Sequence, residues 1–63
     1  MKNLKKYRIA AGMTQQQLAD TVGVVRTHIS NMERGRFTAS VPLAHAIGKA
    51  LKIDWWLLFD EGD

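Results

Sequence analysis

The chain has 63 residues, 9 Lys and Arg against 6 Asp and Glu, and no cysteine, which leaves room for one domain over residues 1–63 and excludes a disulfide framework, a thiolate zinc site and a thiol nucleophile. The longest apolar run, Trp55 to Phe59, is far shorter than the roughly 20 residues that span a bilayer, so we expect a cytoplasmic protein with no membrane partner. Residues 1–36 carry seven cations against two carboxylates, a clustered charge that favours a polyanionic partner but also fits a solvated surface.

The first expected helix covers Leu4 to Ala11. Leu4, Tyr7 and Ala11 recur at helical spacing on one face, and Asn3 before them is a residue type that caps helix starts. Gly12 supplies the left-handed residue that ends such a helix. The pattern predicts a short amphipathic helix with this face on the core.

The second expected helix has the clearest start signal in the chain. Thr14 as N-cap, with Gln17 at the third helical position, predicts a capping box, and Met13 before the cap is placed to pack on Leu18. Gly23 ends the helix. The residues expected to face the core are Leu18, Ala19 and Val22.

Three more helices are expected after Gly23, and no stretch alternates as a strand would. The third follows a tight turn and ends at Gly35. The fourth starts at Ser40 and Pro42, since proline is tolerated in a first helical turn. The fifth is short and is capped by Asp54. The expected core residues are Val25, Ile29 and Met32 in the third helix, Val41, Ala44, Ile47 and Leu51 in the fourth, and Trp55, Leu58 and Phe59 in the fifth. The sequence therefore predicts an all-α fold of five helices.

The outward face of the third helix is polar and carries no anion. Two short helices joined through a glycine turn can place the second in the roughly 12 Å wide major groove of DNA. There, Arg forks onto guanine, Asn pairs with adenine, and Thr offers a hydroxyl and a methyl group to thymine. A solvated amphipathic face has a similar composition, so this face alone leaves both interpretations open. Its residues are Arg26, Thr27, Ser30, Asn31 and Arg34.

Three motifs stand in order across the second and third helices: Thr-Gln-x-x-Leu-Ala from Thr14, Val-Gly-Val from Val22, and Ile-Ser-x-x-Glu-x-Gly from Ile29. Together they resemble the lambda-repressor and Cro-like, or Xre, helix-turn-helix family, and the similarity extends through Leu51 into Leu58. The resemblance implies a compact five-helix domain whose second and third helices form the helix-turn-helix. It also implies a transcriptional regulator, with repression the expected action, that binds double-stranded operator DNA as a homodimer.

The resemblance also implies roles for individual residues. Arg26, Thr27 and Asn31 fall on the base-reading positions, and Arg8 and Glu33 match a partly buried ion pair that joins the first and third helices. The start of the second helix suits a phosphate because its free N–H groups point outward. The residues expected at the DNA backbone or at the rim of the interface are Thr14, Gln15, Gln16, His28, Ser30, Arg34 and Arg36, with a plain exposed histidine as the alternative for His28.

The chain departs from the family at two places. Val25 stands where the family often has a Ser or Thr cap, so the third helix either begins loosely or Val25 packs against the turn or a thymine methyl group. In the last helix, Trp56 and Leu57 stand where the family tends to have polar residues. We expect these two side chains to lie outside and to form the dimer interface; a Trp56 folded over the core as a lid is the alternative.

Two other function classes compete with DNA binding. An antitoxin-like or anti-repressor module would use the same fold to bind a protein with its apolar last helix. An enzyme is disfavoured because His28 and His45 lie on different helices, with neither a glycine-rich phosphate loop nor a metal-binding spacing. We expect no catalytic residue, metal, cofactor or small-molecule ligand, and we expect a solvated tail at Asp60, Glu61 and Asp63.

Overall fold

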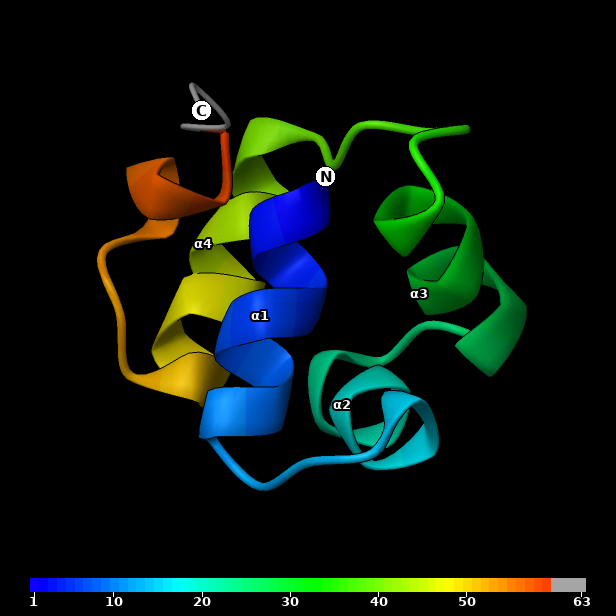
Figure 1. Cartoon of the computed structure of the whole chain (residues 1–63), viewed down its shortest axis with the longest axis horizontal. Helices are drawn as coiled ribbons and strands as arrows, with labels where there is room; N and C mark the ends of the chain where they lie inside the picture. Colours follow the sequence, from blue (N-terminus) through cyan, green and yellow to red (C-terminus); the bar gives the residue numbers. More distant parts are fainter. Residues whose placement is uncertain (60–63) are drawn as a thin grey trace.

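The structure is a computed structural model that describes residues 1–59, and the elements of this part of the chain are all helical. The elements are α1 (Lys2–Ala10), α2 (Gln15–Val22), α3 (Arg26–Glu33), α4 (Val41–Leu51) and the 3₁₀ turn η1 (Trp55–Leu58) (Figure 1). The acidic tail predicted to be solvated lies outside the described residues.

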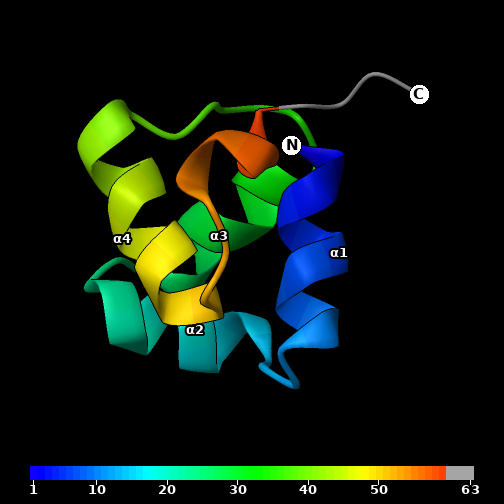
Figure 2. The ribbon, with the colours of Figure 1, turned by 90° about the vertical axis from the view of Figure 1, so that its left-hand side faces the viewer.

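Each element contributes to one small core. α3 packs on α1 and α2, α4 packs on α2 and η1, and η1 also contacts α1, so that α2 lies across the base of the other helices (Figure 2). Every element therefore contributes at least one large side chain to this core. The fully buried large side chains are Leu4, Leu18, Ile29, Met32, Ile47 and Leu58.

Both ends of α2 follow from local sequence chemistry. Thr14 Oγ1 accepts a hydrogen bond of 3.0 Å from the Gln17 backbone N–H, and Gln17 Oε1 accepts one of 2.8 Å from the Thr14 N–H. At the other end Gly23 has φ +79°, a left-handed conformation that closes the helix at no steric cost. The predicted capping box and glycine stop are therefore confirmed.

Four residues expected in the core are exposed. Val25 and Val41 are 70% and 53% exposed because each stands at the start of its helix, ahead of the turn that contacts the core. Ala11 follows α1 and Phe59 follows η1, and both are also exposed. Val25 makes no side-chain cap, as predicted, and it does not pack against the turn.

The first helix begins earlier than expected. Its N-cap is Met1, whose α-amino group donates a 2.9 Å hydrogen bond to the carbonyl oxygen of Met32 at the end of α3. Asn3 lies inside α1 and does not cap it. Its Nδ2 donates instead to the carbonyl oxygen of Leu57, at 2.9 Å, and so connects α1 to η1.

The fifth expected α-helix is a single 3₁₀ turn of four residues, so the five-helix prediction is wrong in this element. Asp54 provides no side-chain cap for it. A Cβ atom added at Gly48 of α4 would lie 2.9 Å from the Trp55 Cα, so the η1 backbone sits directly on α4. The backbone, held this close to α4 at Trp55, makes one tight 3₁₀ turn that ends before Phe59.

Candidate nucleic-acid interface

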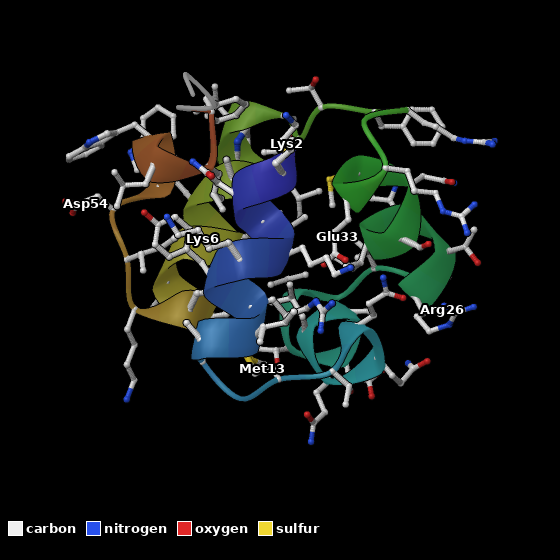
Figure 3. The ribbon with its side chains drawn as sticks, viewed as in Figure 1. Lys2, Lys6, Met13, Arg26, Glu33 and Asp54 are labelled. Atoms are coloured by element: carbon white, nitrogen blue, oxygen red, sulfur yellow. The ribbon has the colours of Figure 1, made fainter. Side chains whose placement is uncertain are left out.

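The inner face of α3 packs on the core, and this packing leaves the outer face of the helix at the surface. Ile29 and Met32 are fully buried, and the 3.6-residue period then turns the opposite side of the helix toward solvent. Arg26 and Thr27 are exposed and Asn31 is partly exposed. Figure 3 shows Arg26 pointing away from the molecule at the outer end of α3. The three residues expected to read bases therefore share an accessible face.

The structure brings Arg8 and Glu33 together between α1 and α3. Arg8 Nε donates to Glu33 Oε2 at 2.6 Å, and Arg8 Nη2 donates to Glu33 Oε1 at 3.2 Å. Their side chains are only 10% and 5% exposed. Arg8 Nη1 also donates to the carbonyl oxygen of Met13, at 2.8 Å, just before α2. One buried guanidinium thus connects all three helices that build the helix-turn-helix and its support.

Gln15 lies between Glu33 and Arg26. Its Nε2 donates to Glu33 Oε1 at 3.0 Å, and its Oε1 accepts from Arg26 Nη1 at 3.1 Å. The first residue of α2 is therefore hydrogen-bonded to both ends of α3. The sequence interpretation placed Gln15 against the DNA backbone and did not foresee these contacts, because a hydrogen bond between two helices leaves no periodic signal.

A hollow of about 350 Å³ opens beside these contacts. Sequence reasoning missed one of its residues, Lys5 of α1, although Lys5 lies three positions before Arg8 on the same helical face. Within residues 1–59, Lys5 and Arg34 have no ion-pair partner, so their charges are available to an anion. The residues that line the hollow are Lys5, Gln15, Arg26, Ser30, Glu33 and Arg34.

Other residues expected at the rim lie outside this hollow. The Thr14 hydroxyl is used in the capping box, and Gln16 Nε2 donates to Asp20 Oδ1 at 2.8 Å. His28 is partly exposed, and its ring centroid lies 5.7 Å from that of Phe37, an exposed aromatic side chain after α3. Arg36 is exposed in the same loop. These residues extend the polar surface along α3 and beyond its end.

The expected dimer residues lie far from α3, since η1 and α3 occupy opposite sides of the molecule in Figure 1. Trp56 is 55% exposed, which disagrees with a Trp56 folded over the core as a lid. Leu57 is partly buried rather than fully outside, because the carbonyl group of this residue is bound by Asn3 and holds it against α1. Trp55 stacks on His45 with ring centroids 4.5 Å apart, and its ring meets that of Trp56 edge to face at 6.0 Å.

The sequence and the fold identify the family. A sequence profile described as helix-turn-helix matches residues 4–55. The chain belongs to the lambda-repressor-like, or Xre, helix-turn-helix family. This is a family of DNA-binding transcription regulators and not an enzyme family.

Similar proteins carry matching descriptions. An uncharacterised HTH-type transcriptional regulator of Methanothermobacter thermautotrophicus is 44% identical over 48 residues, which cover 76% of this chain and 70% of that protein. The Bacillus subtilis regulator YqaF, also uncharacterised, is 33% identical over 58 residues, covering 92% and 76%. The similarity therefore spans most of each of these relatives.

Two solved structures share the fold. A chain in the structure of the complex of the SinR and SinI proteins aligns with a TM-score of 0.85 and 28% identity. The alignment covers 95% of this chain and 59% of that chain. A hypothetical transcription factor from Neisseria, NHTF, aligns with a TM-score of 0.81 and 28% identity, covering 89% of this chain and 63% of that chain. This chain thus spans about three fifths of either aligned chain.

Membrane-spanning helices and clusters of metal ligands are both absent from residues 1–59. None of the helices there is long and apolar enough to cross a membrane. The same residues contain no group of three His, Cys, Asp or Glu side chains placed to hold a metal ion.

Proposed function

We propose that this domain represses transcription by placing α3 in the major groove of an operator, with two copies of the chain on two half-sites. The observation that carries the proposal is the exposed face of α3, which has no carboxylate. The one carboxylate of the helix, that of Glu33, is buried and paired with Arg8. A duplex therefore meets cations and neutral hydrogen-bonding groups there, and no unpaired anion.

Base reading is assigned to Arg26, Thr27 and Asn31. Arg26 is the first residue of α3 and is exposed, so its guanidinium can fork onto guanine O6 and N7. Thr27 and Asn31 follow on the same face, four residues apart. Helix starts are the part of a recognition helix that contacts base edges, which supports Arg26 as the main determinant of sequence preference.

Backbone contacts are assigned to the surfaces on either side of α3. Lys5 and Arg34 line the hollow with unpaired charges, and Arg36 extends the positive surface beyond α3. Charged groups at such places bind phosphates and set the register of the helix without reading sequence. The neutral residues proposed to line this path are Thr14, Gln15, Gln16, His28 and Ser30.

Replacing Arg26 with alanine and replacing Arg36 with alanine are expected to affect DNA binding in different ways. Arg26→Ala should cost about 1–3 kcal/mol on a duplex selected from a random pool and relax the preference at one base pair. Arg36→Ala should weaken binding to all duplexes alike and lower the salt slope by about one unit. Fluorescence anisotropy on the selected duplex and on single-base variants measures both; equal losses on every duplex from both changes would show that Arg26 contacts only the backbone.

A dimer through η1 completes the proposal. One domain of this size covers about half an operator, and specific affinities near 10⁻⁸ M generally need two half-sites about 34 Å apart. Trp56 and Phe59 are exposed aromatic side chains at η1, on the side of the molecule away from α3, and the partly buried Leu57 belongs to the same turn. A large aromatic side chain exposed on a small domain is typical of an interface residue.

Trp56→Lys is expected to give a folded monomer with weaker operator binding, because a charge at the centre of an apolar interface must be desolvated. Sedimentation equilibrium measures the mass, circular dichroism measures the helicity, and anisotropy measures the binding. Lys49→Ala on α4 is a control of similar exposure that leaves the aromatic surface intact. An unchanged dimer in Trp56→Lys defeats this interface, and a loss of helicity assigns Trp56 to the core.

A further inference from the structure

The loop between α3 and α4 carries an exposed aromatic side chain. Phe37 is 50% exposed, and both of its sequence neighbours, Arg36 and Thr38, are exposed as well. Ala39, two positions further on, is buried in the core instead. Figure 1 shows this loop on the α3 side of the molecule, away from η1. The ring of Phe37 therefore lies outside both the core and the aromatic surface of η1.

Hydrogen bonds fix the chain at both ends of this loop. After α3, Gly35 has φ +82°, and the backbone N–H of Arg36 donates to the carbonyl oxygen of Asn31 at 2.9 Å. This hydrogen bond belongs to a Schellman motif, which sets the direction of the chain as it leaves a helix. At the start of α4, Ser40 Oγ accepts a hydrogen bond of 3.3 Å from the Leu43 backbone N–H. The short connection that carries the aromatic ring is thus anchored on both sides.

The ring of Phe37 contacts α3 itself. Its centroid lies 5.7 Å from that of His28, and the two ring planes are tilted by 37°. Aromatic pairs at this separation attract each other beyond the area that they bury. His28 belongs to the first turn of α3, whereas Phe37 follows the end of that helix. The loop therefore turns back along the flank of α3 and places the ring beside the helix.

This position determines what the ring meets when α3 enters DNA. An α-helix with its side chains is about 10–12 Å in diameter and fills a major groove roughly 12 Å wide. A side chain on the flank of the helix therefore meets the wall of the groove, which consists of phosphates and deoxyribose sugars. A phosphate suits a cation such as Arg36, whereas the apolar C–H edge of a sugar suits a phenyl ring. The sugar is thus the part of the wall that Phe37 can contact.

We propose that Phe37, supported by His28, packs against a deoxyribose of the operator and adds an apolar contact to the ionic contacts of the backbone. The inference rests on the proposed function, in which α3 enters the major groove. Burial of apolar surface releases no condensed counterions, so the gain in affinity from this contact does not change with salt. Every nucleotide offers the same sugar edge. Phe37 therefore contributes to affinity and not to sequence preference.

Phe37→Ala removes the ring and leaves every charge in place. We expect it to weaken binding to the selected duplex about five- to tenfold, as for burial of roughly 50 Å² of apolar surface. The factor should be the same at 50 and 200 mM salt, and the same on single-base variants of the duplex. Arg36→Ala is the comparison from the neighbouring position, and its effect should shrink as salt rises because it removes a phosphate contact. Fluorescence anisotropy measures both variants, after circular dichroism has shown that they are folded.

These titrations also separate the inference from the proposed function. A loss below about twofold for Phe37→Ala at both salt concentrations overturns the inference, and so does a loss that shrinks with salt as that of Arg36→Ala does. The proposed function stands in either case, as long as the unmodified chain binds the duplex and its affinity falls steeply with salt. If the unmodified chain binds no duplex, the proposed function fails and the inference fails with it. A lower mass of Phe37→Ala in sedimentation equilibrium would assign the ring to a contact between two copies and also overturns the inference.

A double-mutant cycle tests the support from His28. His28→Ala should weaken binding in the unmodified chain by a larger factor than in the Phe37→Ala background, because the second background has no ring left to support. Equal factors in both backgrounds would show that His28 acts independently of Phe37 and would overturn that part of the inference.

A measurement on the unmodified complex gives an independent outcome. In an isotope-filtered nuclear Overhauser spectrum, the ring protons of Phe37 should show contacts to the H4′ and H5′ protons of a deoxyribose. The ring protons of Phe59 at η1 are the internal comparison and should show contacts to protein only. A Phe37 ring that shows no contact to a sugar in the bound complex overturns the inference, even if a Phe37 variant fails to fold.

Discussion

Glu33→Ala is expected to destabilise the domain by roughly 3–5 kcal/mol, because it leaves the charge of Arg8 buried without its carboxylate. The Arg8 side chain is 10% exposed, and Nε and Nη2 both donate to Glu33. At roughly 0.05–0.15 kcal/mol per residue, a domain of this size has a free energy of unfolding of about 3–9 kcal/mol, so the substitution should remove a large part of its stability.

Urea unfolding followed by circular dichroism measures this loss. Asp20→Ala is the control: it also removes one carboxylate from the helix-turn-helix, but Asp20 is exposed and bonded only to Gln16, so its effect should stay within about 0.5 kcal/mol. A loss below about 1 kcal/mol for Glu33→Ala would contradict the structural role given to the pair.

Affinity for the selected duplex is expected to fall about a thousandfold or more between 50 and 200 mM salt. Such a loss corresponds to about six or more phosphate contacts, because each neutralised phosphate releases condensed counterions. The cations available around α3 include Lys5, Arg26, Arg34 and Arg36, and a dimer doubles this number. Anisotropy titrations at several salt concentrations give the slope directly.

Salt also separates DNA binding from the competing function. A protein-binding module that uses the aromatic surface of η1 would bury apolar groups, whose association does not weaken with added salt. An affinity that is equal at both salt concentrations would therefore contradict phosphate binding. It would instead indicate that the chain binds a protein through the exposed side chains of Trp56 and Phe59.

Much of the fold follows from local chemistry. The capping box at Thr14 and the glycine at Gly23 set both ends of α2 within a few residues, and the spacing of Ile29 and Met32 sets which face of α3 is buried. Such signals depend on neighbours in sequence, so they predicted the helix-turn-helix well. The exposed face of α3 follows from the same spacing.

The remaining features depend on contacts between distant residues. Whether residues 55–58 form an α-helix or a 3₁₀ turn depends on how closely Gly48 lets the backbone approach Trp55, which the sequence of the segment does not reveal. The exposure of Val41 depends on where its helix meets the core. The hydrogen bonds of Gln15 join two helices and have no periodic signature.

The central claim is that α3 reads the sequence of a duplex, and parallel selection from a random pool of DNA tests it most directly. The unmodified chain and a variant with Arg26, Thr27 and Asn31 all replaced by alanine are selected side by side, after circular dichroism has shown that both are folded. We predict that the unmodified chain enriches one motif, repeated with its half-sites about 34 Å apart, and that the variant enriches none. Enrichment of the same motif by both proteins, or of none by either, would contradict the claim.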